Sequence, residues 1–389
     1  MPQYTMNSDY AAYVAMDVHS RSITMHAVSL ETGEPRTRRL TGCPGAAEVV
    51  EWAKSWLPDP ILFVYESGPC GFQLQRDIEA LGCACRIAAV TSIPRSPEDK
   101  YLKDDRRDAR RLLSEITKMD GKVKFVYVPS PRMESLRDLT RARHDAVKAA
   151  KRSKQQAAGL LTRYGHVWDE KTPTGRRCET WTEKHKSWMK SAEFDQALTR
   201  RTLDLYVQNA TEDIERVKNL TRLCLAEAEK PDVKPYVDAL TRLKCVDVMT
   251  ALAFLASMGD FERFSNGRSV SSYFGLTPRR SDSGEKTGRN GKITKAGDTL
   301  CRMLLTEGVG GIGAAKSNVK KLRKGQVVSP QVEAEARKCN ARNRARYEHL
   351  TASGKHANVA KIAVASELVR DMWIIGRMVQ REQAEQEAR

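Results

Sequence analysis

The chain has 389 residues, of which 40% are hydrophobic, and a formal net charge of +17, and this length is enough for two or three domains with separate cores. Its sequence shows no apolar run of about 18 residues and no charged-then-apolar N-terminal pattern, which argues against a membrane helix and a secretion signal. The nine cysteines are scattered and include no CxxC pair, so we expect reduced thiols in a cytoplasm and neither a disulfide framework nor a CxxC zinc site.

Residues 1–128 have the pattern of an α/β domain. Two β-rich apolar runs at 13–20 and 22–30 are separated by a short polar turn, as in a β-hairpin, and 35–42 can add a third, more exposed strand. We then expect a helix at 46–57, an apolar central strand at 61–68, a helix at 72–82 and a strand at 85–90. Three hairpin-type strands followed by alternating helix and strand predict an RNase H-like (RuvC-like) mixed sheet.

Residues 129–238 are expected to form a long helical coiled-coil arm. The pattern is helical from about 130 to 164, is broken at 172–177, and becomes helical again over roughly 191–230. Both helical stretches are long and rich in charge, which predicts an antiparallel helical hairpin.

Residues 239–389 are expected to form a mostly helical C-terminal domain. Helical patterns at 240–310 are interrupted by a Gly-rich polar loop, and the apolar segment 359–379 predicts a closing helix. Between them, a basic and apolar-poor stretch at about 316–345 predicts an exposed insertion.

The positive charge is concentrated in two segments. Residues 131–190 contain 15 Lys or Arg against 7 Asp or Glu, and residues 277–325 contain 12 against 4, so that the rest of the chain is nearly neutral. Two basic segments in a neutral frame predict two surfaces for a polyanion, most simply nucleic acid. A membrane surface fits less well, because neither segment has the Trp/Phe/Leu face of an interfacial helix.

Four carboxylates from three expected elements form a candidate metal site. Asp17 lies in an otherwise apolar strand, where a carboxylate is costly unless it is paired or bound to metal. Glu66 lies near the end of the central strand, and Asp105 and Asp108 share one face at the start of a helix. These acids can converge on two divalent cations that clamp a phosphodiester, and oxygen ligands favour Mg²⁺, with Mn²⁺ as a substitute. Spacing alone leaves Asp104 as an alternative, and each acid taken singly is more often structural.

Two serines form a candidate nucleophilic site. Ser281 and Ser283 lie on the Gly-rich loop, close in sequence to the cations Arg279, Arg280, Lys286 and Arg289. A serine hydroxyl among fixed cations can attack a phosphodiester, with the cations stabilising the charge that develops on phosphorus. Ser-Gly loops are also ordinary linkers, so the chemistry of these residues alone leaves the nucleophile open.

The candidate metal site and the candidate nucleophilic site together resemble one family, the insertion-sequence recombinases guided by a bridge RNA. These have an N-terminal RuvC-like DEDD domain and a C-terminal serine transposase domain. The resemblance covers nearly the whole chain. Its N-terminal motifs are MDV at 16–18, YESG at 65–68 and KDDRRDA at 103–109, and its C-terminal motifs are GDFERFS at 259–265, YFGLTP at 273–278, SG at 283–284 and ITKAG at 293–297.

This resemblance implies a role for each acid and for the serine. Asp17, Glu66, Asp105 and Asp108 would hold the metal ions, whereas Asp104 stands where the family usually has threonine. Ser283 would be the nucleophile, with Ser281 as the alternative, and would form a covalent phosphoserine link to DNA.

The family has two further motifs from which this chain departs. The glycine-rich motif expected before the serine block is Lys-Cys-Val-Asp at 244–247. The Leu-Arg pair expected after Gly297 is offset by one, as Leu300-Cys301-Arg302.

The resemblance also gives each basic segment a ligand. The first would grip the guide RNA or an RNA–DNA duplex, and the second would hold the DNA that is cut. The residues expected to bind nucleic acid are Arg141, Arg143, Lys148, Lys151, Arg152 and Lys154 in the first segment, and Arg279, Arg280, Lys292, Lys295 and Arg302 in the second. In contrast, we expect Trp181, Trp188 and Trp373 to be core or coiled-coil contacts, and His19 and His26 to be polar strand residues.

The function expected from the sequence is therefore that of an RNA-guided DNA recombinase or transposase of an insertion sequence. Its cofactors would be Mg²⁺ and a guide (bridge) RNA, and its partners donor DNA, target DNA and further copies of the chain, as a dimer or as a tetramer in the synaptic complex. The alternative is a metal-dependent RuvC-type structure-specific endonuclease with water as nucleophile. A third, non-enzymatic possibility is an architectural nucleic-acid-binding protein.

Overall fold

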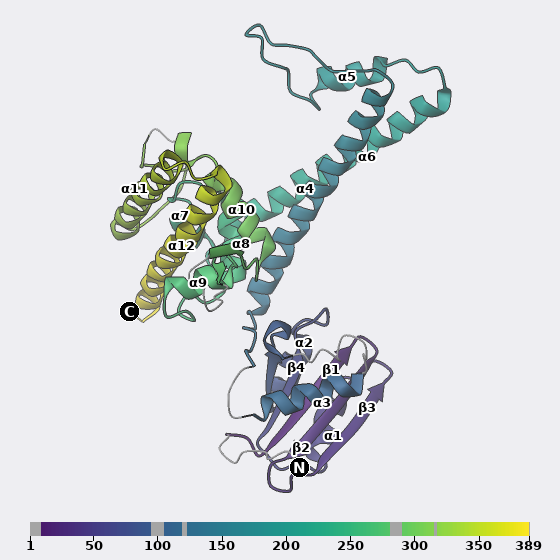
Figure 1. The fold of residues 1–389 in the computed structure, drawn as a ribbon, viewed down its shortest axis with the longest axis vertical. Coiled ribbons are helices and arrows are strands. Elements are labelled where there is room, and N and C mark those ends of the chain that lie inside the picture. The colour runs from purple at the N-terminus through teal and green to yellow at the C-terminus, as the bar shows by residue number, and fades with distance from the viewer. Residues whose placement is uncertain (1–8, 95–104, 119–122, 281–289, 315–316, 389) are drawn as a thin grey trace, which may run out of the picture. The chain divides into compact units, whose positions relative to one another are not determined.

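The computed structural model describes residues 9–94, 105–118, 123–280, 290–314 and 317–388. The chain forms two compact units, Met1–Val128 and Pro129–Arg389. Figure 1 labels the helices of both units and the strands β1–β4 of the first. Among the described residues, no helix combines the length and the apolar composition that crossing a membrane requires.

The N-terminal unit is built on a five-stranded mixed sheet with the order β3-β2-β1-β4-β5. The strands are β1 (Ala12–His19), β2 (Ser22–Ser29), β3 (Pro35–Thr41), β4 (Ile61–Glu66) and β5 (Ala84–Ala88). The first three pair antiparallel, whereas β4 runs parallel to β1 and β5 parallel to β4. The expected mixed α/β architecture is confirmed, and it is consistent with an RNase H-like fold.

The two faces of this sheet are covered by different helices. Alternate side chains along a strand point to opposite faces. Met16 and Phe63 belong to one core, to which α1 (Ala46–Lys54) and α2 (Gln73–Ala80) contribute, whereas Ala15 and Val64 belong to a second core with Leu112 and Leu113 of α3 (Asp105–Ile116). Helix α3 therefore covers the face opposite to α1 and α2.

The second unit begins with two long antiparallel helices, α4 (Pro131–Arg163) and α6 (Ala197–Ala228), which lie side by side (Figure 1). Arg132 at the start of α4 pairs with Glu227 at the end of α6 at 2.6 Å. At the other end, Leu161 of α4 clusters with Leu203 of α6. The expected helical pair is therefore present, and its coiled-coil geometry stays a prediction. A separate short helix, α5 (Glu183–Ser191), precedes α6 and is not expected from the sequence pattern.

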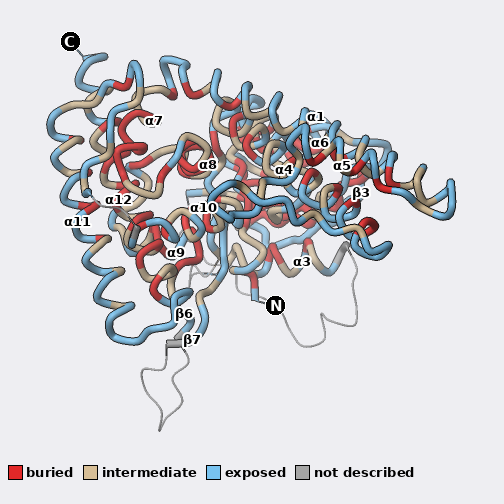
Figure 2. Tube along the Cα trace, turned by 90° about the horizontal axis from the view of Figure 1, so that it is seen from above, coloured by how far each residue is buried: buried red, intermediate tan, exposed pale blue. Residues whose placement is uncertain are grey.

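The rest of the second unit is a helical domain. Its elements are α7 (Lys234–Leu240), α8 (Val248–Met258), α9 (Gly267–Tyr273), α10 (Thr299–Val309), α11 (Pro330–Ala352) and α12 (Ala357–Glu387), with a hairpin of β6 (Pro278–Arg280) and β7 (Asn290–Ile293). Buried residues are dense along α7, α8 and α12 in Figure 2. The same core contains Leu136 of α4 and Cys224 of α6. The root of the arm is therefore built into this domain.

The basic stretch at 316–345 differs from the expected exposed insertion. Val332, Ala336 and Cys339 of α11 are fully buried in the main core, and Nζ of Lys320 donates a 2.6 Å hydrogen bond to the carbonyl oxygen of Val246. The expectation of an insertion is therefore corrected for the described residues from 317 on. The buried apolar residues at 332, 336 and 339 form one narrow stripe of α11, and charged residues on its other faces dominate the composition of the segment.

Candidate active site and nucleic-acid interface

Two of the predicted acids lie side by side on the sheet of the N-terminal unit. Asp17 follows Met16 in β1 and Glu66 follows Tyr65 in β4, and the parallel register pairs Met16 with Tyr65. The alternation of side chains along both strands turns the two carboxylates toward the face that α3 covers. Sequence position and strand register together are therefore enough to place these acids next to each other.

A third acid joins them through an arginine on α3. Nη2 of Arg111 lies 3.2 Å from Oε1 of Glu66 and 3.2 Å from Oδ1 of Asp108, and all three side chains are partly buried. A guanidinium between two carboxylates offsets their mutual repulsion. The acids thus form a site for positive charge, and Arg111 provides part of that charge in this structure. The sequence analysis does not identify Arg111, although its i, i+3 spacing from Asp108 is the available signal.

The surroundings of Asp17 add two polar groups. Its Oδ2 atom lies 3.2 Å from Nε2 of His19, so His19 borders the site and is more than the polar strand residue that the sequence suggests. Thr24 is opposite Asp17 on β2, is 1% exposed, and its hydroxyl has no hydrogen-bond partner among the described residues. A buried hydroxyl left without a partner is costly, and a bound water could satisfy it.

The oxygen atoms of these side chains are of the kind that a hard divalent cation prefers. The set consists of carboxylate oxygens on one face, next to an unsatisfied hydroxyl, and Mg²⁺ prefers such oxygen ligands together with water. Within the described residues, no group of three or more His, Cys, Asp or Glu side chains is placed to hold a metal ion. The side chain of Asp105, the fourth predicted acid, lies outside the description, as does Asp104.

In the second unit, the structure describes the base of the serine loop. Ser281 and Ser283 themselves lie outside the described residues, and so do Lys286 and Arg289. Strands β6 and β7 pair antiparallel on either side of them, with Pro278 opposite Ile293. Both serines therefore belong to the segment that joins the paired strands β6 and β7.

Two glycines lock the base of this hairpin to the segment before it. Gly275 and Gly297 both have positive φ angles, of 66° and 67°. A Cβ atom at Gly275 would lie 2.3 Å from the carbonyl oxygen of Ala296, and one at Gly297 would lie 2.0 Å from that of Tyr273. Only glycine fits such approaches of backbone to backbone. The YFGLTP and ITKAG motifs are thus two halves of one contact.

Arg302 stabilises this contact from a buried position at the hairpin base. Its side chain is 9% exposed, and Nη1 donates hydrogen bonds to the carbonyl oxygens of Phe274 at 3.1 Å and Ala296 at 2.6 Å. The prediction that Arg302 binds nucleic acid is corrected: its guanidinium is engaged by the backbone of the hairpin base. Buried carbonyls at such turns need donors, and an arginine can serve two at once.

Three other residues of the second basic segment that are predicted to bind nucleic acid are exposed. Arg279 on β6, Lys292 on β7 and Lys295 just after it lie at the surface of the hairpin and its base. The side chain of Arg280 lies outside the description. Three of the predicted binding residues are therefore accessible to a polyanion beside the serine loop.

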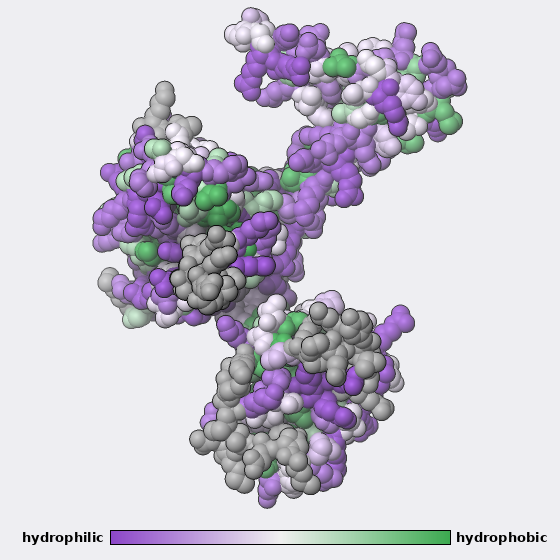
Figure 3. Space-filling view, viewed as in Figure 1, coloured by the Kyte–Doolittle hydropathy of each residue, from purple (hydrophilic) through white to green (hydrophobic). Residues whose placement is uncertain are grey.

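The predicted binding residues of the first basic segment lie in different surroundings along α4. Figure 3 shows that the visible surface of the arm is largely hydrophilic. Arg143 is partly buried and donates to Oγ1 of Thr221 on α6 at 3.2 Å, whereas Lys151 and Arg152 are exposed. Arg141 and Lys148 line one cavity, and Lys151 and Lys154 line another farther along the helix. Arg143 therefore helps to hold the helix pair together.

The cavity at Arg141 lies next to the hairpin base. It has a volume of about 500 Å³, with Arg137, Arg141, His144, Asp145 and Lys148 of α4 on one side, and Ser257, Tyr273 and the segment 297–300 on the other. Arg141 pairs with Asp298 at 2.9 Å, and the Asp298 side chain accepts the backbone N–H of Cys301 at the start of α10. The basic side chains at 137, 141, 144 and 148 share one face of α4, so helical spacing could have identified Arg137 and His144.

His144 is the titratable group of this cavity. Burial lowers its pKa below the ordinary value, and the charge of Lys148 lowers it further. The imidazole is therefore neutral near pH 7, and the positive charge of the cavity comes from its arginines and lysine.

Comparison with known proteins matches both units. Residues 14–166 match the model of the DEDD transposases of IS110 type, and residues 237–324 match that described as the transposase IS116/IS110/IS902 family. The first range contains all four predicted acids, and the second contains Ser283 and the hairpin base.

Individual relatives are also transposases by name. A putative transposase y4qE of Sinorhizobium fredii is 33% identical over 82% of this chain and 75% of its own length. The transposase for insertion sequence element IS1533 of Leptospira borgpetersenii is 27% identical over 66% of this chain and 72% of its own length. A probable family 20 transposase of Pseudomonas aeruginosa is 24% identical over 81% of this chain and 84% of its own length.

Proposed function

Because this chain belongs to the IS116/IS110/IS902 family of transposases, we propose that it cuts and rejoins the DNA of its insertion sequence through a covalent bond to Ser283, under the guidance of an RNA. The observation that carries the serine proposal is the hairpin base. Gly275, Gly297 and Arg302 fix both strands that lead to the loop. A nucleophile needs such fixed support to reach a phosphate in the productive geometry.

The proposed reaction exchanges one ester for another. The Oγ atom of Ser283 bonds to phosphorus, and the sugar oxygen leaves with a proton. Attack by a sugar hydroxyl of another strand then releases the serine. Arg279, Lys292 and Lys295 lie on the hairpin and at its base, and they would stabilise the charge on the phosphate oxygens.

The carboxylates of the N-terminal unit would hold Mg²⁺, or Mn²⁺ in its place. Asp17, Glu66 and Asp108 are the described members of this set, and Asp105 would complete it. When bound, the metal supplies Lewis acidity at a phosphate oxygen. Arg111 holds Glu66 and Asp108 in place, and it would give up part of this contact to the cation.

The cationic cavity on α4 would hold the DNA backbone close to the serine loop. Arg137, Arg141 and Lys148 line it together with Tyr273 of the hairpin base. Phosphate contacts of this kind position a duplex without reading its sequence. Sequence would be read by a guide RNA through base pairing, and two copies of the chain or more would hold the donor and target duplexes.

The test is to trap the covalent protein–DNA adduct and to locate it. Tryptic cleavage after Arg280 and Lys286 releases the peptide 281–286, which contains both serines. We expect this peptide to carry the nucleotide, and we expect the adduct to vanish in Ser283→Ala and to persist in Ser281→Ala. Loss of the adduct in Ser281→Ala alone would assign the nucleophile to Ser281. An adduct on neither serine would contradict the proposal.

The metal-dependent endonuclease is the second candidate, and the paired acids of the sheet favour it. In that case water attacks the phosphate and Ser283 is structural. Cleavage that continues at the wild-type rate in Ser283→Ala, with no adduct in either protein, would establish this alternative.

RNA guidance has its own test. RNA that co-purifies with the protein is sequenced, and strand exchange is then measured with that RNA and with a version whose unpaired loops are changed. We expect the target sequence to follow the change. An unchanged target would show that side chains select the site.

A further inference from the structure

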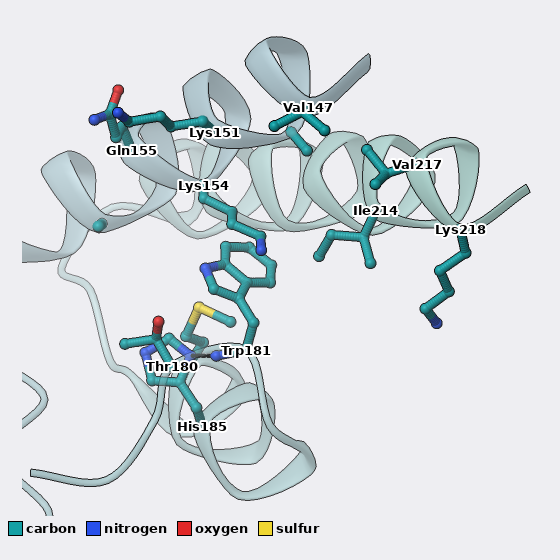
Figure 4. A pocket seen from close by; sticks show the side chains of 13 residues that line it. Val147, Lys151, Lys154, Gln155, Thr180, Trp181, His185, Ile214, Val217 and Lys218 are labelled. Atoms are coloured by element: carbon teal, nitrogen blue, oxygen red, sulfur yellow. Dashed lines mark hydrogen bonds between the residues drawn. The ribbon is translucent and has the colours of Figure 1, made fainter. Parts of the chain in front are cut away.

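A second cavity, of about 510 Å³, opens on the arm between α4, α6 and the segment around α5 (Figure 4). Its walls are apolar, with Val147 and Ala150 from α4, Ile214 and Val217 from α6, and Met189 from α5. Lys151, Lys154 and Lys218 also line it, and none of its described lining residues is acidic. The volume falls in the range of small-ligand sites, and the charge at its edge is positive.

Trp181 forms the aromatic wall of this cavity. It is a non-glycine residue with a positive φ of 66°, a conformation that costs about 1–3 kcal/mol and that occurs where ligands are held. Its backbone N–H donates to Nδ1 of His185 at 3.1 Å, and His185 in turn packs edge-on against Trp168. The strained backbone is thus held by the buried His185, while the indole remains partly exposed.

Lys154 lies near the ring face of the Trp181 indole. Figure 4 shows its side chain extending toward the Trp181 ring, and Nζ lies 5.8 Å from the ring centroid. This distance is close to the limit of about 6 Å for a cation–π contact, so the contact is weak. The flexible lysine can exchange the ring for a phosphate at little cost.

We propose that this cavity binds an unpaired nucleobase of a single-stranded nucleic acid, stacked on Trp181, with the three lysines contacting the adjacent phosphates. An aromatic platform beside a row of cations is the arrangement by which proteins hold single strands. A protein segment with an apolar face would fill the walls but offer no anion to Lys151 and Lys154, whereas Lys218 already pairs with Glu215 at 3.2 Å. Trp181 also packs against the hydrophobic cluster of the arm, as the sequence predicts. The proposal adds a binding role that does not depend on Ser283 or on the metal site.

The test measures the binding of single-stranded and duplex oligonucleotides of equal length to the full chain. We expect Trp181→Ala to weaken single-strand binding roughly 5- to 100-fold, the range for loss of one stacked base, and to leave duplex binding unchanged. Trp181→Phe should retain most of the affinity. Binding measured separately with RNA and with DNA single strands shows which of the two nucleic acids the cavity prefers.

Matched lysine variants separate the cavity from general attraction. Lys154→Ala should weaken single-strand binding, whereas Lys190→Ala on α5, an exposed lysine that does not line the cavity, should have less effect. Equal losses for single strand and duplex in Trp181→Ala would overturn the proposal, and so would a change of oligomeric state with single-strand binding intact.

Photocrosslinking covers the case in which Trp181→Ala does not fold. A single strand containing 4-thiouracil is crosslinked to the wild-type chain, and the modified peptide is identified by mass spectrometry. Crosslinks at Trp181 or at the lysines of the cavity support the site. Crosslinks confined to other parts of the chain contradict it.

Discussion

The carboxylate site and the serine hairpin are built in opposite ways. In the first, regular elements carry the functional side chains, and the parallel register of β1 and β4 places Asp17 beside Glu66. In the second, the site depends on backbone contacts. Gly275 and Gly297 allow two segments to approach closely, and Arg302 donates hydrogen bonds to carbonyl oxygens of both. Substitution of the acids at the first site should therefore lower activity while the fold is retained, whereas substitution at the hairpin base should lower both activity and stability.

The largest effect is expected at the carboxylates. The double variant Asp17→Ala/Asp105→Ala should lose strand exchange by roughly 10³-fold or more, because the metal would lose two ligands, while the folded structure is retained. Thermal unfolding and strand exchange are measured together. Asp104→Ala is the matched control and should remain active, and full exchange in the double variant would refute the metal site.

The second effect is expected at the hairpin base. Gly297→Ala adds a Cβ that would lie 2.0 Å from the backbone oxygen of Tyr273, and the left-handed backbone is strained as well. We expect a loss of about 2–5 kcal/mol in the free energy of unfolding, together with loss of activity.

Gly325→Ala isolates the part of this loss that comes from the backbone angle. Gly325 also has a positive φ, of 73°, but apart from its chain neighbours no atom of the described residues lies within 4 Å of its Cβ position. Its substitution should cost only about 1–2 kcal/mol in stability. Equal losses in the two variants would show that the interlock is unimportant.

A third comparison sets the buried arginine of the hairpin against an exposed one. Arg302→Met should lower the free energy of unfolding by about 1–3 kcal/mol, because the carbonyls of Phe274 and Ala296 lose their donor. Arg279→Ala should leave stability unchanged and reduce the slope of log affinity against log salt by about one. A salt-slope change in Arg302→Met of the same size would restore its direct role in binding.

The smallest effect is expected at Arg111. Its guanidinium competes with a metal ion for Glu66 and Asp108, so Arg111→Gln should strengthen Mn²⁺ binding a few-fold while it weakens the metal-free fold. Electron paramagnetic resonance measures free Mn²⁺ without recourse to activity. Unchanged Mn²⁺ affinity would mean that the guanidinium and the metal ion do not share these carboxylates.

The two sites also differ in how far sequence patterns predict them. Asp17 and Glu66 lie in strands whose alternation and pairing follow from the pattern, so their shared face could be predicted. Arg302 could not be assigned, because its burial depends on carbonyl groups brought close by the interlocked glycines. Helix α11 was likewise unexpected in the core, since charged residues outnumber the few apolar residues of its buried face. Trp181 owes its place in the cavity to a strained backbone that no local pattern indicates.

The fate of solvent oxygen distinguishes attack by Ser283 from attack by water. DNA is cleaved and rejoined in water enriched in ¹⁸O, and the phosphates at the new junctions are analysed by mass spectrometry. Ester exchange through Ser283 conserves the phosphate oxygens, so the account predicts no ¹⁸O in the joined product. Incorporation of ¹⁸O at the cleaved phosphate would identify water as the nucleophile and contradict it.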